Sequence, residues 1–192
     1  ISFAELRDAY GVQARGLIDG GVDLLIVETC QDLLQTKAAL AAIFALFEQT
    51  HKRVPVIAQV TIETFGTMLN GTEIAAALTA LAPFPIDVVG MNCGTGPKHM
   101  TESIRYICEN SPLPVSVLPN AGLPSVVEGK MHYDETPQSF TAHLVHFAND
   151  FGVNVVGGCC GTTPAHLRLV VEAMQQIKPK PRSAKTLPAA SS

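Results

Sequence analysis

Apolar and polar positions along the chain follow two alternating patterns. Short runs rich in Val, Ile and Leu, typical of buried parallel strands, alternate with longer stretches whose apolar residues recur at helical spacing. The predicted strands cover residues 22–28, 54–62, 86–92, 113–119 and 153–158. The predicted helices cover residues 3–18, 33–48, 72–81, 99–109, 137–150 and 164–177. This regular order predicts an α/β protein in which repeated βα units build a parallel sheet.

Prolines mark the beginnings of three of these helices. Pro97, Pro137 and Pro164 stand at about the first helical position, where a missing N–H costs nothing because that group has no partner inside the helix. Thr136 and Thr163 precede two of the prolines and can cap the free N–H groups of the first turn. We therefore expect three helices to begin at these prolines.

The number of units bears on the fold class. Five strands preceded by one helix fall short of a closed (βα)8 TIM-type barrel, which typically needs about 250 residues. We predict roughly the last five βα units of such a barrel, with residues 1–177 as a partial barrel domain. Residues 178–192 mix Pro, Lys, Ala and Ser without periodicity, which is typical of a linker or tail toward a following domain. Because the chain lacks an initiating Met and a signal peptide, we expect it to be cut from a longer one.

Composition and charge argue against several classes of function. The 192 residues are 47% hydrophobic, enough for one globular core, and no apolar run approaches the roughly 20 residues that span a bilayer. Lys and Arg total 13 against 17 acidic residues, and neither sign forms a block, so we expect no nucleic acid and no membrane as partner. Five cysteines, two of them adjacent, fit reduced thiols in the cytoplasm better than a disulfide framework.

Candidate functional residues gather where predicted strands end. Glu28, Asn92, Cys93 and Asn120 each end or follow a strand, and the pair Cys159–Cys160 ends the last one. Parallel α/β folds build their active sites at the carboxyl ends of the strands, so we expect these side chains at one mouth of the barrel. Glycines on both sides of the cysteine pair allow the backbone turn that aims both sulfurs at one point.

Three of the cysteines form a candidate zinc site. Cys93, Cys159 and Cys160 supply three thiolates without a fourth protein ligand, which is typical of a catalytic zinc whose open position admits a substrate. A substrate thiol held there is deprotonated and electron-rich, so the pattern favours alkyl transfer to sulfur. Two other interpretations stay open at this point: the adjacent pair packs without further function, or it cycles as a redox-sensitive disulfide.

The other candidates have structural interpretations beside the functional ones. Glu28 is placed to hold a substrate ammonium or to pair with a surface cation. Asn92 and Asn120 offer polar groups to a substrate, although asparagine is also common in turns. Cys108 lies on an apolar helix face and is predicted to belong to the core, and Cys30, a competing ligand, is better explained by packing. Four histidines are predicted on helices outside the mouth, in solvated or packing roles: His99, His143, His146 and His166.

Three segments resemble the homocysteine-binding domain of cobalamin-dependent methionine synthase. They are residues 90–93 (GMNC), 119–124 (PNAGLP) and, with the highest specificity, 157–164 (GGCCGTTP). The resemblance implies a barrel fold and homocysteine S-methyltransferase activity that yields methionine. It also implies that Cys93, Cys159 and Cys160 bind zinc, that homocysteine coordinates through its sulfur, and that Glu28 contacts its amino group.

The same resemblance implies a methyl donor outside this chain. The donor would be methylcobalamin on another domain, recharged from methyltetrahydrofolate, so the expected partners are homocysteine and the folate- and cobalamin-binding domains of the same polypeptide. Two alternatives stay open. One is a related methyltransferase that uses betaine or S-methylmethionine directly, against which the linker-like residues 178–192 weigh mildly. The other is a non-catalytic zinc or thiol-redox module.

Overall fold

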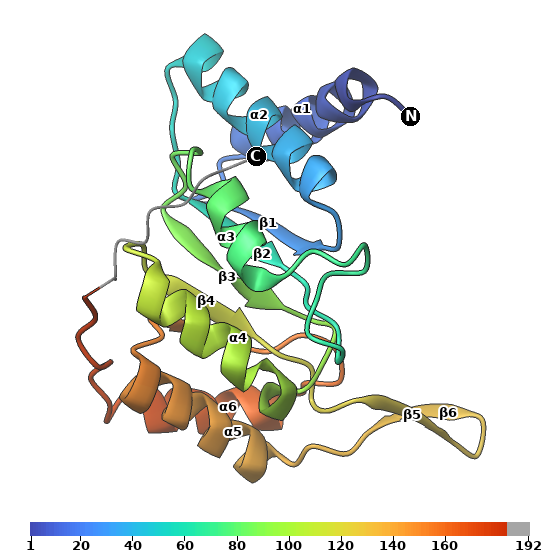
Figure 1. Ribbon diagram of the computed structural model, residues 1–192, viewed down its shortest axis with the longest axis vertical. Helices are drawn as coiled ribbons and strands as arrows, with labels where there is room; N and C mark the ends of the chain where they lie inside the picture. Colours follow the sequence, from blue (N-terminus) through green and yellow to red (C-terminus); the bar gives the residue numbers. More distant parts are fainter. Residues whose placement is uncertain (184–192) are drawn as a thin grey trace.

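The computed structural model describes residues 1–183, which form a five-stranded parallel sheet with helices packed on it (Figure 1). The sheet order is β1-β2-β3-β4-β7, so each strand pairs with the strand of the next βα unit. The strands are β1 Leu25–Cys30, β2 Val56–Val60, β3 Val88–Asn92, β4 Val115–Leu118 and β7 Val155–Val156. This arrangement confirms the predicted α/β class and the five consecutive units of a (βα)8-type barrel.

All six predicted helices are present. They are α1 Phe3–Asp19, α2 Leu33–Thr50, α3 Ile74–Leu81, α4 Pro97–Asn110, α5 Pro137–His146 and α6 Pro164–Met174. Three of them begin at the prolines that the sequence indicated. The hydroxyl of Thr136 accepts a hydrogen bond from the Ser139 N–H at 3.2 Å, which caps α5. At the N-terminus, Ser2 and Glu5 form a capping box that fixes the start of α1.

The core lies between the sheet and the apolar stripes of the helices. All five residues of β2 are buried, as expected for a central strand covered on both faces. Ile104 and Ile107 of α4 face this core, and Phe140 and Phe147 are fully buried in it. Fully burying one such side chain contributes roughly 1.5–3 kcal/mol. Packing therefore holds the strand ends in the fixed positions that a site at the rim of the sheet requires.

A β-hairpin that we did not predict interrupts the fourth unit. β5 Pro124–Val127 and β6 Lys130–Tyr133 pair in antiparallel register across Glu128 and Gly129, whose φ angles of 51° and 75° are typical of a type I′ turn. In Figure 1 the hairpin extends away from the rest of the molecule. All four residues of β5 are exposed. A strand without a buried face does not show the alternation of apolar and polar residues from which strands are predicted, so the hairpin was missed.

The end of the predicted helix 137–150 also differs. α5 stops at His146, and the chain continues as a π-helical turn, η1 Phe147–Phe151, which Gly152 ends in a left-handed conformation with φ of 81°. The rings of Phe147 and Phe151 stack with centroids 5.9 Å apart, and Phe147 is fully buried. The wider π-helical turn was not predicted, because the spacing of apolar residues along the sequence does not distinguish it from a continued α-helix.

The carboxyl-terminal residues of the described chain lie against the sheet and its helices. Arg182 donates hydrogen bonds to the backbone carbonyls of Cys108, Ser111 and Leu113. Residues 184–192, the rest of the predicted linker, lie outside the described residues. Among residues 1–183, no helix has both the length and the apolar character that crossing a bilayer requires.

Candidate metal centre

The sulfurs of Cys93, Cys159 and Cys160 converge at the carboxyl-terminal edge of the sheet. All three lie within 4.8 Å of one another, with 3.8 Å between Cys93 and Cys160 and 3.9 Å between Cys159 and Cys160. Two sulfurs bound tetrahedrally at the usual Zn–S distance of about 2.3 Å lie about 3.8 Å apart. The spacing therefore fits three ligands of one tetrahedral metal ion, whereas a disulfide needs about 2.05 Å.

The backbone at the end of β3 turns the Cys93 side chain toward this point. Cys93 has φ of 58°, a left-handed conformation that is uncommon outside glycine, and Gly94 follows with φ of 70°. A Cβ at Gly94 would stand 2.9 Å from the carbonyl oxygen of Ile62, so the close approach requires glycine. The Cys93 N–H still donates to the carbonyl of Leu118 at 3.1 Å, which keeps this turn attached to β4.

The loop that follows β4 holds the adjacent cysteine pair. The Cys159 N–H donates to the carbonyl of Pro119 at 2.8 Å, and the Cys160 N–H donates to Oδ1 of Asn120 at 3.1 Å. In return, the N–H of Ala121 donates to the carbonyl of Cys160 at 2.9 Å. The conspicuous sequence segments 119–124 and 157–164 are therefore two halves of one structure, because the first supplies the hydrogen-bond partners of the second.

Asn92 connects the cysteine cluster to the end of β1. Its side chain is fully buried, its Oδ1 accepts from the Thr29 N–H at 2.7 Å, and its Nδ2 donates to the Thr29 hydroxyl at 2.8 Å. The same Nδ2 lies 3.9 Å from the sulfur of Cys159. Thr29 has φ of 57° and needs such support. The amide of Asn92 thus bonds within the protein, and its binding of substrate stays a prediction.

The other two predicted substrate residues lie at the same edge of the sheet. Glu28 is exposed and directly precedes Thr29, which places its carboxylate on the strand end that Asn92 supports. Asn120 is 4% exposed, and its Oδ1 is engaged by the Cys160 N–H. Asn120 therefore orients a cysteine in this structure. Contacts of Glu28 and Asn120 with a substrate stay predictions.

The remaining cysteines are separate from the cluster. Cys30 and Cys108 are 5% and 3% exposed and belong to the hydrophobic core, in agreement with the packing roles expected for them. Burial raises the pKa of the Cys30 thiol, and burial raises that of Cys108 to about 11. Both are therefore neutral thiols at physiological pH. By contrast, Cys93 and Cys159 are partly exposed and Cys160 is exposed, which leaves the cluster accessible.

The electrostatics of the cluster favour a cation. Burial, together with the nearby sulfur of Cys93, raises the pKa of the Cys159 thiol to about 12. Three thiolates this close repel one another, so they do not all ionise without a positive charge between them. A divalent metal ion supplies that charge, and its binding would release protons.

One residue of this region, Tyr133, was missed as a site residue, whereas the buried His166 has the packing role expected for it. Tyr133, the last residue of β6, packs its ring against Gly161, the residue that follows Cys160. Partial desolvation, with the nearby Cys160 as the next cause, raises the pKa of Tyr133. His166 is 6% exposed and bridges Thr163 and the carbonyl of Glu135. No sequence signal indicated Tyr133, because it reaches the cluster through a hairpin that has no buried face.

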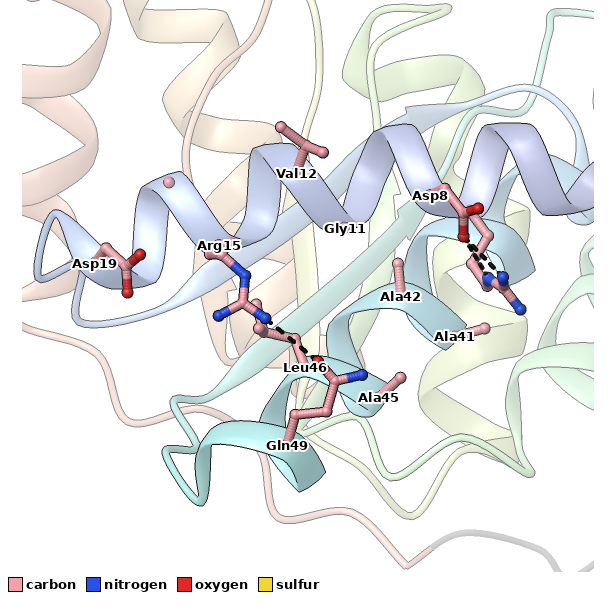
Figure 2. A pocket seen from close by; sticks show the side chains of 12 residues that line it. Asp8, Gly11, Val12, Arg15, Asp19, Ala41, Ala42, Ala45, Leu46 and Gln49 are labelled. Carbon is pink, nitrogen blue, oxygen red and sulfur yellow. Dashed lines mark hydrogen bonds and ion pairs between the residues drawn. The ribbon is translucent and has the colours of Figure 1, made fainter.

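The groove between α1 and α2 is unrelated to these residues. Its volume is about 780 Å³, and none of the predicted site residues lines it. Figure 2 shows Arg15 reaching across it to Gln49 of α2, at 3.2 Å, over a floor that includes the small side chains Ala42 and Ala45. Among residues 1–183, the metal-binding side chains that cluster are the three cysteines, and they lie outside this groove.

Comparisons with known proteins identify the family to which the chain is similar. A family model described as homocysteine S-methyltransferase matches residues 1–174. The chain is 47% identical over 190 residues to the methionine synthase of Mycobacterium tuberculosis, and 47% identical over 169 residues to that of Mycobacterium leprae. The two matches include 99% and 88% of this chain, but only 16% and 14% of the lengths of the two relatives.

The fold resembles that of a solved enzyme. The apo form of the homocysteine methyltransferase MmuM from Escherichia coli superposes with a TM-score of 0.71, over 90% of this chain and 57% of that one. The metallated form gives a TM-score of 0.65, over 85% and 51%. Sequence identity is 22% in both cases, so the two superpositions show a similar fold and nothing further.

Proposed function

The chain belongs to the homocysteine S-methyltransferase family, and from this premise we propose that it transfers a methyl group to the thiol of homocysteine, giving methionine. The observation that carries the proposal is the convergence of three cysteine sulfurs at the strand ends, at the spacing of ligands on one tetrahedral ion. In the reaction a bond forms between the homocysteine sulfur and the methyl carbon. The bond from that carbon to the donor breaks, its electron pair stays on the donor, and the thiol proton goes to solvent.

We propose zinc as the ion that Cys93, Cys159 and Cys160 hold. Three thiolates suit zinc, and the described residues offer no fourth cysteine, histidine or carboxylate to this cluster, as a site open to substrate requires. When bound, zinc would supply a Lewis acid that keeps a substrate thiol deprotonated near neutral pH.

The residues of the chain orient these ligands and the substrate. Asn120 and the carbonyl of Pro119 fix the backbone of the cysteine pair, which sets the directions of both sulfurs. Asn92 ties Cys159 to the strand end that carries Glu28. We propose that the exposed Glu28 carboxylate pairs with the ammonium group of homocysteine, so that the amino acid is anchored at one end while its thiol lies at the cysteines.

The relatives support a particular methyl donor. Both are methionine synthases about six times as long as this chain, which leaves room in them for other domains. We propose that residues 1–177 are part of a homocysteine-binding barrel, that residues 178–192 lead toward a following domain, and that methylcobalamin on another domain provides the methyl group. The five free thiols fit a cytoplasmic protein.

Metal analysis combined with X-ray absorption tests the proposal. Purified wild-type chain is compared with Cys159→Ala, with Cys108→Ala as a control that removes a thiol from the core. We expect one zinc per chain in the wild type and the control, bound by three sulfurs and one lighter atom, and none in Cys159→Ala. Adding homocysteine should raise the sulfur count to four.

Other outcomes would overturn parts of the proposal. A folded wild-type chain without zinc would favour the thiol-redox interpretation. A fourth protein sulfur before homocysteine is added would indicate a closed structural site. If homocysteine binds but methylation proceeds from betaine or S-methylmethionine without cobalamin, the proposed donor is wrong and the homocysteine site stands.

A further inference from the structure

Tyr133 lies against the cysteine cluster although it comes from the projecting hairpin. Its ring packs flat on Gly161, so closely that a methyl group at position 161 would overlap the ring carbons. Gly161 directly follows Cys160 and has φ of 78°, so both its conformation and its missing side chain make room for the ring. The side chain of Tyr133 therefore lies beside Cys160, and desolvation, with the nearby Cys160 as the next cause, raises the pKa of its hydroxyl.

The segment that follows Tyr133 is fastened on two sides. The Glu135 N–H donates to the carbonyl of Ala121 at 3.0 Å, in the loop that braces the cysteine pair. The Glu135 carbonyl lies 3.0 Å from Nε2 of His166, whose other ring nitrogen lies 3.2 Å from the N–H of Thr163. Since Nδ1 accepts from that N–H, Nε2 carries the proton and donates to Glu135.

These contacts join the hairpin to both halves of the cysteine-holding structure. His166 is 6% exposed and packs edge-on against the buried Phe140, with ring centroids 5.5 Å apart, so its position is fixed. Tyr133 stands two residues before the fastened Glu135. Its ring is therefore held at the cysteines even though the outer part of the hairpin projects from the molecule (Figure 1).

We propose that Tyr133 is a positioning residue of the metal centre, which donates a hydrogen bond from its hydroxyl to the Cys160 sulfur and covers that side of the cysteine loop with its ring. The proposal rests on the metal-binding role of the cysteines given above.

The physical consequence follows from the proposed hydrogen bond. A donor bonded to a metal-bound sulfur withdraws electron density from it, which lowers the energy of the sulfur lone pairs and fixes the side-chain direction of Cys160. Loss of such an outer partner typically weakens metal binding about 10–100-fold. The ring acts separately, because it covers one side of the loop that carries the exposed Cys160 and so limits the approach of reagents from that side.

Cobalt(II) substitution in the full chain tests the hydrogen bond. Tyr133→Phe removes the hydroxyl and keeps the ring, and Tyr10→Phe is the matched control, since it removes a hydroxyl that bonds to Gln35 on α2. In Tyr133→Phe we expect the sulfur-to-cobalt charge-transfer band to move to longer wavelength and the cobalt dissociation constant to rise about 10-fold. Tyr10→Phe should match the wild type in both readouts.

Alkylation of the metal-free chain tests the cover. The variants Tyr133→Ala and Tyr133→Phe both lack the hydroxyl and differ in the ring, so their comparison isolates shielding. We expect iodoacetamide to modify Cys160, quantified by peptide mass spectrometry, several-fold faster in Tyr133→Ala. Circular dichroism of each variant establishes that it is folded.

The outcomes separate this inference from the proposed function. If the wild type shows a sulfur-to-cobalt band and Tyr133→Phe has the same band and affinity, the positioning role is wrong and the metal centre stands. Equal alkylation rates in the two Tyr133 variants would overturn the cover. If the folded wild type shows no sulfur-to-cobalt band, the metal centre itself is wrong and the positioning role fails with it.

Discussion

The rim of the sheet and the core beneath the helices both contain cysteines, in contrasting surroundings. At the rim, Cys93, Cys159 and Cys160 stand on loops, and their sulfurs point at one another. In the core, Cys30 and Cys108 lie within regular elements and are almost completely buried among apolar side chains. The rim cysteines are accessible and mutually repelling as thiolates, whereas the core cysteines are neutral packing groups.

The five residues are of one type, so the difference between their roles comes from the backbone conformation and the surroundings of each cysteine. Cys93 adopts a left-handed conformation next to glycine, and the Cys159–Cys160 loop is held by hydrogen bonds from the segment after β4. Cys108 sits on a regular helix whose period turns its side chain inward. The metal site uses cysteines on loops, whose backbone departs from regular secondary structure, whereas the core uses cysteines whose side chains follow the period of a helix or strand.

Removing a rim cysteine should have the largest effect on metal binding. We expect Cys93→Ala to weaken zinc binding by more than the about 10–100-fold that loss of an outer partner costs, because a ligand itself is lost. Cys30→Ala, its control in the core, should bind zinc like the wild type. Competition with a chromophoric chelator measures both, and equal affinities would remove the distinction between rim and core.

Acidification should release metal from the rim. The Cys159 pKa is raised to about 12, so without metal the thiol keeps its proton at neutral pH, and metal binding must displace it. Binding therefore weakens as pH falls, by about 10-fold per pH unit for each displaced proton. Zinc affinity measured from pH 6 to pH 8 checks this. A flat profile would indicate that the rim thiols already carry charge without metal.

The Asn92 brace should have a smaller effect than loss of a ligand. Asn92→Ala removes both bonds to Thr29 and the contact with Cys159, so we expect zinc affinity to fall about 10–100-fold. Asn70→Ala is a suitable control, since Asn70 is exposed and bonds to Asp32. Unchanged affinity in Asn92→Ala would limit its role to holding the end of β1.

Core cysteines should affect stability and leave the metal untouched. Cys108→Ala deletes a buried sulfur on α4, and we expect the free energy of unfolding to fall by about 1 kcal/mol, or roughly 2–4 °C in Tm. Urea unfolding and calorimetry measure this change, and zinc content should remain as in the wild type. Loss of zinc from folded Cys108→Ala would show that the two regions are coupled.

Much of the fold was predictable from local sequence. Proline at the first position of α4, α5 and α6, and the alternation of apolar runs with helical periods, predicted the elements because these signals act within a few residues. The hairpin β5–β6 was missed because β5 is exposed throughout. The π-helical turn was missed because packing around Phe147 determines it.

The sequence by itself determined the set of candidate residues, and the tertiary structure determined how they are used. Placing Cys93 and the pair Cys159–Cys160 at strand ends follows from the βα order, since parallel strands end at one edge. Only the folded chain brings Tyr133 onto Gly161 and engages the amide of Asn92 with Thr29. Contacts between residues tens of positions apart depend on register and on left-handed turns, which a local pattern of polar and apolar residues does not encode.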